Sequence, residues 1–204
     1  IILVDDGSTD ATTLTINNLQ SINNKVKILH HAKNLGKGAA VRTGIQYATG
    51  DYILIQDADL EYNPKDIPRL LKPVLQGKTT VVYGTRLKRL PNLARDERTF
   101  RFLMHYFGNR LLSIITSLLY GQWITDMETG YKLFPGKALS DIKLSARSFD
   151  FEPEITAKIL KKGLAILEIP ITTNPRGYDE GNKLSTFKDG AIALWTLLKY
   201  RFMN

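Results

Sequence analysis

The sequence has no cysteine and only three histidines among its 204 residues. Without cysteine, the protein has no disulfide, no thiolate zinc site and no cysteine nucleophile. With so few histidines, a bound metal has to rely on carboxylates, which selects a hard cation such as Mg²⁺ or Mn²⁺. The longest apolar run without charge, 111–125, is shorter than the roughly 20 residues that a membrane-spanning helix needs. We therefore predict neither a transmembrane span nor a signal peptide.

Negative charge is also in short supply, because 28 Lys and Arg face 20 Asp and Glu, a formal net charge of +8. This excess predicts an anionic partner: nucleic acid, a phosphorylated small molecule or an acidic membrane surface. Hydrophobic residues make up 43% and charged residues 24%, which excludes a disordered or collagen-like chain. The length and the absence of repeats or linkers predict one compact domain, residues 1–204.

Short apolar runs typical of strands alternate with segments of helical period along the chain. This order predicts an α/β domain with a largely parallel central sheet flanked by helices. Ser8 or Thr9 can cap the first helix, and Pro64 is well placed at the start of another. Strands are predicted at 1–4, 26–30, 51–56, 79–84 and 165–171, and helices up to residue 22 and at 36–48, 64–75, 95–120, 153–162 and 186–202.

An acidic row, Asp57, Asp59 and Glu61, follows the predicted strand at 51–56. Ligands of open α/β sheets bind beyond the carboxyl ends of strands, where these side chains are expected. Carboxylates two residues apart on an extended chain point to one side, so both can face one cation. A cation held there can bridge a diphosphate and stabilise the charge of a leaving nucleotide diphosphate. The alternative interpretation is a solvated acidic turn that caps the helix beginning at Pro64.

Two further segments are candidates for contact with a nucleotide. Asp6 follows the first strand in the sequence Asp5-Asp6-Gly7, and one carboxylate there can accept hydrogen bonds from a base or ribose. Lys37 lies in a glycine-containing loop before a helix, where free N–H groups attract phosphate. That loop is neither a Walker loop nor a dinucleotide-binding fingerprint. The plain alternatives are a helix N-cap for the acidic pair and a solvated lysine on a flexible turn.

The whole chain carries an ordered set of blocks: VDDGSTD at 4–10, NLGKGAAVRTGI at 34–45, GDYILIQDADLEYNP at 50–64, VVYGTRL at 81–87, TDMETGYKLF at 125–134, FEPEITAKILKKG at 151–163 and RGYDEGNKLS at 176–185. In this order and spacing they resemble the family 2 glycosyltransferases of the GT-A fold, and most closely the polyprenyl-phosphate sugar synthases, such as the dolichyl-phosphate mannose and glucose synthases. In that family a first strand and a P-x-Y-N-E-like segment come before the first block, so we expect such a segment before Ile1.

The resemblance implies an inverting transferase that moves a hexose from a nucleotide sugar, of the GDP-mannose or UDP-glucose type, to a polyprenyl or dolichyl phosphate. It implies that Asp6 contacts the base or ribose of the donor. Asp57 and Asp59 would bind the metal, Mg²⁺ or Mn²⁺, and the donor diphosphate, and Glu61 would complete the metal shell. Lys37 is predicted to contact the same nucleotide sugar.

By the same resemblance, cations after the acidic row bind the donor and acceptor phosphates. Guanidinium and ammonium groups make strong charge-assisted hydrogen bonds to phosphate oxygens. Lys132 stands where relatives more usually carry Arg, and this exchange loses bidentate geometry. Each cation alone has a plain alternative as a solvated surface charge. The predicted phosphate ligands are Arg86, Lys132, Arg176 and Lys183, and Arg86 and Lys132 are also assigned to the catalytic group.

The acceptor decides whether the reaction needs a base. A lipid monophosphate has a second pKa of about 6 and is mostly dianionic at neutral pH, so positioning and charge stabilisation supply most of the acceleration. A sugar hydroxyl would need a carboxylate base, for which Asp126 is the candidate and Glu128 a weaker one. A turn residue bonded to its own backbone is the plain alternative for Asp126. Residues 1–90 are expected to bind the donor and 91–204 the acceptor.

The C-terminal part of the chain is expected to contact a membrane surface. Residues 100–124 are rich in Leu, Ile, Phe and Tyr, and the amphipathic helix at the C-terminal end sets Trp195 beside Lys199 and Arg201. This mixture suits a headgroup layer, and cytoplasmic leaflets attract cationic surfaces. Core packing explains the same residues equally well. The prediction is a cytoplasmic enzyme peripheral to the membrane.

Other functions stay open from the sequence. A transferase acting on a glycan hydroxyl would serve polysaccharide or cell-envelope synthesis, and a catalytically silent module would bind nucleotide sugar without turnover. Binding to nucleic acid fits the positive charge, but the sequence has no recognised reader motif, so no nucleic-acid partner is predicted.

Overall fold

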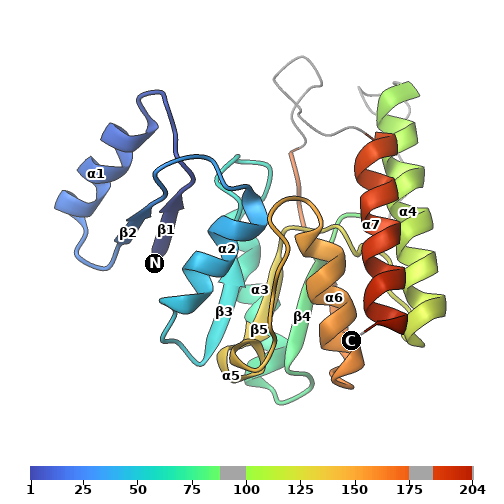
Figure 1. The fold of residues 1–204 in the computed structure, drawn as a ribbon. Coiled ribbons are helices and arrows are strands. Elements are labelled where there is room, and N and C mark those ends of the chain that lie inside the picture. The colour runs from blue at the N-terminus through green and yellow to red at the C-terminus, as the bar shows by residue number, and fades with distance from the viewer. Residues whose placement is uncertain (88–99, 175–185, 204) are drawn as a thin grey trace.

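The computed structural model describes residues 1–87, 100–174 and 186–203, and it has the predicted α/β architecture, with helices flanking mostly parallel strands (Figure 1). The elements are β1 (Ile2–Asp5), α1 (Thr12–Ile22), β2 (Lys27–His30), α2 (Lys37–Gln46), β3 (Tyr52–Ile55), a 3₁₀ turn (Pro64–Asp66), α3 (Ile67–Leu75), β4 (Val81–Thr85), α4 (Phe100–Tyr120), β5 (Lys132–Pro135), α5 (Gly136–Ser140), α6 (Phe151–Lys161), β6 (Ile166–Pro170) and α7 (Thr186–Phe202).

The described strands form two sheets. In the smaller one, β1 and β2 pair in parallel, with Asp5 opposite His30. The larger sheet has the order β3-β5-β4-β6, in which β4 and β6 are parallel and β5 is antiparallel to β3 and β4. Because β3, β4 and β6 run in one direction, their carboxyl ends meet at the same edge of the sheet.

One strand, β5, is not predicted from the sequence. Its four residues are too few to show a period of two, and it is held by its neighbours β3 and β4. The expected cap of the first helix at Ser8 or Thr9 is wrong. Helix α1 begins after Ala11 with no side-chain cap, and Ser8 N instead donates to Asp5 Oδ1 at 3.0 Å.

The core lies on both faces of the larger sheet. Successive side chains of a strand point to opposite faces, and β4 shows this with Val81 and Val82, which are both fully buried. Val81 belongs to the cluster that includes Ile155 of α6, whereas Val82 packs in the cluster that includes Leu70 of α3. With both faces covered by helices, the polar groups gather at the ends of the strands.

Candidate active site

Lys37 joins α2 to the carboxyl end of β3 and to the first turn of α6. It follows Gly36, whose φ of 97° favours glycine and where a Cβ would lie 2.2 Å from the carbonyl oxygen of Arg147. Lys37 Nζ lies 2.9 Å from Asp57 Oδ2 and 2.8 Å from Glu152 Oε1. Burial opposes the charge of Lys37, but the carboxylates of Glu152 and Asp57 outweigh it and raise the pKa of the ammonium. Two carboxylates therefore share one charged ammonium.

The acidic row lies on the turn after β3, as predicted from the sequence. Glu61 N donates to Asp59 Oδ1 at 3.2 Å, and Leu60 between them has a φ of 62° and a side chain that is 88% exposed. Among the described residues, no three His, Cys, Asp or Glu side chains form a group arranged to hold a metal ion. The metal role of Asp57, Asp59 and Glu61 stays a prediction.

Gly130 makes room for the carboxylate of Asp57. A Cβ at Gly130 would lie 2.4 Å from Asp57 Oδ2 and 3.2 Å from the ring of Tyr62. Gly130 N donates to the Tyr62 hydroxyl at 2.8 Å, and the Tyr131 hydroxyl donates to Gln56 Oε1 at 2.5 Å. The two tyrosine rings pack with their centroids 4.8 Å apart. These contacts fix the segment before β5 against the acidic turn.

Asp6 fixes the loop that leads into α2. His31 Nδ1 lies 2.6 Å from Asp6 Oδ1, and the N–H groups of Leu35 and Gly36 donate to the carboxylate at 2.9 and 2.8 Å. His31 Nε2 lies 2.9 Å from Thr43 Oγ1 of α2. Burial opposes ionisation, but these hydrogen bonds hold the pKa of Asp6 below its usual range. The predicted contact of Asp6 with a base or ribose stays a prediction.

Arg86 and Asp126 form a two-point ion pair beside the carboxyl end of β4. Nε and Nη2 of Arg86 each donate to Asp126 at 2.8 Å, and the backbone N–H of Arg86 adds a third bond at 2.9 Å. Asp126 is 0% exposed, and its own N–H donates to Glu168 at 2.9 Å. The structure thus brings these two predicted site residues together, bonded to each other. The predicted ligands Arg176 and Lys183 lie outside the described residues.

Lys132, at the start of β5, is buried beneath the loop that follows Asp126. Its ammonium donates to the carbonyl oxygen of Met127 at 2.9 Å and to that of Thr129, and it lies 4.5 Å from the centroid of the Tyr83 ring. Burial lowers the pKa of Lys132, and it raises the pKa of Glu128 to about 8. Glu128 Oε1 is buried and has no hydrogen-bond partner among the described residues. The Lys132 ammonium therefore bonds to the loop that precedes it in the chain. Its contact with phosphate stays a prediction.

Glu152 and Gly130 belong to the site but were not singled out from the sequence. Glu152 lies in the first turn of α6 and is 3% exposed. The sequence could have indicated Glu152, because a carboxylate flanked by apolar residues in a helix turn needs a cationic partner if that turn is buried. Gly130 carried no such signal, since its role depends on how closely Asp57 and Tyr62 approach it in space.

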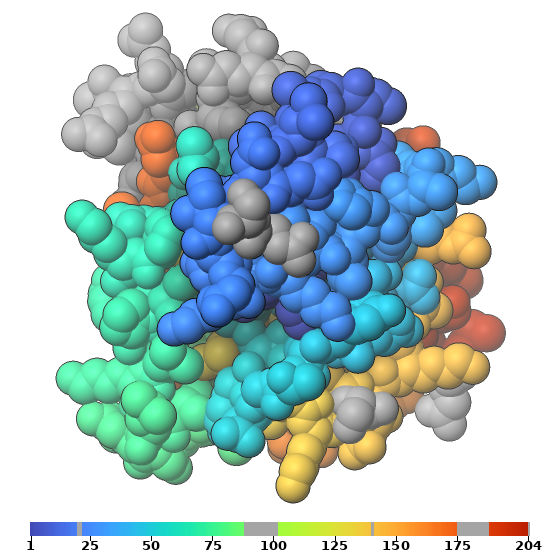
Figure 2. Space-filling model, turned by 90° about the vertical axis from the view of Figure 1, so that its left-hand side faces the viewer, coloured from blue at the N-terminus to red at the C-terminus, as the bar shows by residue number. Residues whose placement is uncertain are grey.

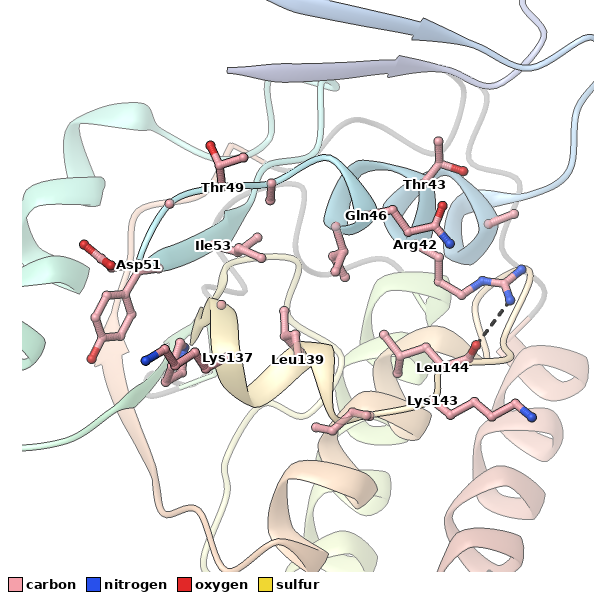
Figure 3. Close-up of a pocket in the computed structure, with 18 of the residues that line it drawn as sticks. Arg42, Thr43, Gln46, Thr49, Asp51, Ile53, Lys137, Leu139, Lys143 and Leu144 are labelled. Carbon is pink, nitrogen blue, oxygen red and sulfur yellow. Dashed lines mark hydrogen bonds between the residues drawn. The ribbon is translucent and has the colours of Figure 1, made fainter.

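A cavity of about 1090 Å³ lies apart from these residues, between α2 and α5. Arg42 of α2 and Lys137 of α5 both line it, and the Arg42 guanidinium donates to the carbonyl oxygen of Leu144 at 3.2 Å (Figure 3). From outside, the cyan segment of α2 and β3 lies against the yellow segment of β5 and α5 (Figure 2). Asp51, before the amino end of β3, also lines the cavity, whereas the acidic row follows the other end of that strand. Leu35 and Thr43, which contact Asp6 and His31, reach its lining, but neither Lys37 nor the acidic row does, so the cavity is not the candidate donor site.

Comparison with known sequences gives consistent matches. A family model described as Glycosyl transferase family 2 matches residues 1–142. The low-salt glycan biosynthesis hexosyltransferase Agl6 of Haloferax volcanii is 30% identical over 206 residues, covering 100% of this chain and 45% of Agl6. Glycosyltransferase AglJ of the same organism is 26% identical, covering 98% of this chain and 62% of AglJ. The chain thus spans about half the length of these relatives.

Comparison with solved structures identifies the fold. Glucosyl-3-phosphoglycerate synthase from Mycobacterium tuberculosis, in complex with Mn²⁺, UDP and glucosyl-3-phosphoglycerate, matches with a TM-score of 0.70 and 20% sequence identity. The match covers 100% of this chain and 69% of the synthase. At this identity it bears on the fold alone, and it confirms the expected GT-A fold.

Proposed function

The chain belongs to glycosyl transferase family 2, and on that basis we propose that it is an enzyme that transfers a hexose from a nucleotide sugar to a polyprenyl or dolichyl phosphate. One observation carries the proposal. At the carboxyl ends of β3 and β4, the acidic turn of Asp57 meets the ammonium of Lys37, and Arg86 lies at the same edge of the sheet. A nucleotide sugar of the GDP-mannose or UDP-glucose type needs both charges, carboxylates for a bridging cation and cations for the diphosphate itself.

Asp57 and Asp59, with Glu61, would hold Mg²⁺ or Mn²⁺ in this proposal. Their chemistry fits, because all are carboxylates on one turn and hard cations prefer oxygen ligands. Gly130 supports the same role, since only a residue without a Cβ leaves Asp57 Oδ2 in its present place. When bound, the metal would supply positive charge against the donor diphosphate. The Mn²⁺ and UDP in the related synthase structure support this assignment.

The geometry around Asp126 favours a phosphate acceptor. A general base has to reach the proton that it removes, but Asp126 is buried and both of its oxygens accept hydrogen bonds from Arg86. A phosphate dianion needs no base. One of its oxygens forms a bond to the anomeric carbon while the bond from that carbon to the donor diphosphate breaks, and the nucleoside diphosphate leaves with the electron pair. Attack in line with the leaving group inverts the anomeric carbon.

Transfer to a glycan hydroxyl is the second candidate. The similarity to Agl6, which is named as a hexosyltransferase of glycan biosynthesis, supports it. In that reaction Asp126 would have to separate from Arg86 before it could accept a proton from the acceptor.

Contact with the cytoplasmic face of a membrane follows from a lipid acceptor. Among the described helices, none combines the length and hydropathy needed to span a bilayer. Helices α4 and α7 lie side by side at the edge of the molecule away from α1 (Figure 1). They expose Leu118 and Trp195, which are 79% and 63% exposed, and α7 adds Lys199 and Arg201 in its last turn. An apolar surface with basic neighbours fits an anionic headgroup layer.

A thermal-shift screen with UDP, GDP and their sugars, each with and without Mn²⁺ or Mg²⁺, tests the donor site. A ligand at about 100 times its Kd should stabilise the protein by roughly 2.7 kcal/mol. We expect a shift for one nucleotide only, and only with metal; that donor is then tested for transfer to a short polyprenyl phosphate. Donor binding without transfer to either acceptor class would leave a silent binding module, and no shift with any nucleotide would contradict the proposed donor site.

A further inference from the structure

Lys37 contacts the same carboxylate that the proposed function assigns to a metal ion. Its ammonium lies 2.9 Å from Asp57 Oδ2, so the negative charge of Asp57 is balanced by the protein itself. A divalent cation and an ammonium on one carboxylate repel each other strongly where solvent screening is incomplete. Lys37 and Asp57 are only 25% and 23% exposed. The two cations therefore compete for Asp57.

Glu152 gives Lys37 a second place to bind. Its Oε1 lies 2.8 Å from Lys37 Nζ, and its side chain is 5% exposed. Its other oxygen, Oε2, is buried and has no hydrogen-bond partner among the described residues. An ammonium that leaves Asp57 can therefore gain a bond to Glu152 without leaving the site, because a lysine ammonium has three donors. Because Glu152 Oε2 is an unused acceptor, Lys37 can exchange Asp57 for Glu152 as its partner and is not confined to one fixed ion pair.

We propose that Lys37 holds the place of the metal on Asp57 until the donor arrives, and that Glu152 is the positioning residue on which Lys37 pivots. The inference rests on the proposed function, because that function supplies the cation at Asp57. Without nucleotide, the ammonium opposes binding of the metal. With a nucleoside diphosphate present, the phosphate oxygens attract the ammonium away from Asp57 and the metal takes its place. Metal and diphosphate then bind cooperatively, and neither binds tightly alone.

Titration with Mn²⁺, monitored by the electron paramagnetic resonance signal of the unbound ion, tests this without any turnover. Lys37→Gln should bind Mn²⁺ alone roughly tenfold more tightly than the unmodified chain, since one opposing charge is gone. Glu152→Gln should bind Mn²⁺ alone no more tightly than the unmodified chain does, because the Lys37 ammonium then has only Asp57 as its charged partner. Both variants lose a charge partner and both should lose stability, so a merely structural role cannot explain a gain in Mn²⁺ affinity for Lys37→Gln alone.

The double variant Lys37→Gln with Glu152→Gln guards against misfolding, because it removes the more buried of the two carboxylates together with their shared cation. It should bind Mn²⁺ alone as tightly as Lys37→Gln. Lys33→Gln is the matched control and should change nothing. If UDP or GDP promotes Mn²⁺ binding in the unmodified chain but Lys37→Gln and the double variant show no gain with Mn²⁺ alone, the competition is refuted and the proposed function stands. If no variant binds Mn²⁺ with any nucleotide, the proposed metal site fails and the inference fails with it.

Discussion

Arg86 binds both carboxylate oxygens of Asp126, with Nε 2.8 Å from Oδ2 and Nη2 2.8 Å from Oδ1. The two residues are 40 positions apart in the chain. One follows β4 and the other follows α4, so the pair joins the segment expected to bind the donor to the segment expected to bind the acceptor. Burial opposes the charge of Arg86, but Asp126 outweighs it and raises the pKa of the guanidinium. A bidentate pair of this kind holds its partners in one orientation.

Asp126→Asn should separate the structural role of this pair from catalysis. Removal of one partner leaves Arg86 without its counter-charge, so we expect unfolding in urea to show a loss of about 3–5 kcal/mol. With a phosphate acceptor, kcat of the folded variant should fall less than about tenfold. A hydroxyl acceptor would need the base, and the loss would then be about 10²–10⁴-fold. A loss in that higher range with a phosphate acceptor would overturn the view that this reaction needs no base.

Asp59→Ala should abolish the metal-dependent binding of donor without unfolding the domain. Asp59 lies on a turn, and the carboxylate is expected to bind the metal. Loss of a charged ligand weakens the binding of a hard cation, so the thermal shift with nucleotide and Mn²⁺ should disappear. Asp51→Ala is the control, because that acid is exposed and lies before the opposite end of β3. An unchanged shift in Asp59→Ala would remove this residue from the metal site.

Gly130→Ala tests the space behind Asp57. The new Cβ would lie 2.4 Å from Asp57 Oδ2, so the carboxylate has to move. A side-chain end can move at modest cost, and we expect a stability loss of about 1–2 kcal/mol together with a larger, roughly tenfold or greater loss of donor affinity. Gly190→Ala, where a Cβ meets nothing within 4 Å, should be neutral or gain up to about 1 kcal/mol in its helix. Equal donor affinity in the two variants would show that the close approach has no functional role.

Much of this fold could be predicted from sequence, because the strands and helices are set by local patterns. The apolar run before Asp57 and the period of α7 are legible in a single chain. The strand β5 is not, since its four residues become a strand only by pairing with β3 and β4. The acidic turn could be located for the same local reason. Contacts such as that of Glu152 with Lys37 depend on tertiary approach across 115 positions, and no local pattern encodes such an approach.

The stability of the protein should fall as pH rises from about 4.5 to about 8 through one group, Glu128. Burial raises its pKa from 4.5 to about 8, so in this range the folded state keeps a proton that the unfolded chain releases. Glu128→Gln removes the effect. Relative to the unmodified chain, it should gain on the order of 2 kcal/mol between pH 5 and pH 8, measured by urea unfolding at each pH. Lys132→Met should not reproduce this trend. Burial lowers the pKa of Lys132 from 10.5 to about 8, so the folded state releases the lysine proton only at about pH 8 and above. A pH-independent difference for Glu128→Gln would contradict the buried, protonated state.

The exposed face of α4 and α7 should bind anionic vesicles through Leu118 and Trp195. These side chains are 79% and 63% exposed, and transfer of each into the headgroup boundary would bury apolar area worth about 1.5–3 kcal/mol when complete. In co-sedimentation with phosphatidylglycerol vesicles, the double variant Leu118→Ser with Trp195→Ser should bind at least about tenfold more weakly. Leu75→Ser is the matched control, because Leu75 is 82% exposed at the end of α3, outside this helix pair. Binding should also weaken with salt, since Lys199 and Arg201 attract the anionic surface only over about 10 Å at 0.1 M ionic strength. If the control variant loses as much binding as the double variant, the contact with lipid is not made by α4 and α7, and the lipid acceptor would have to reach the site from another face.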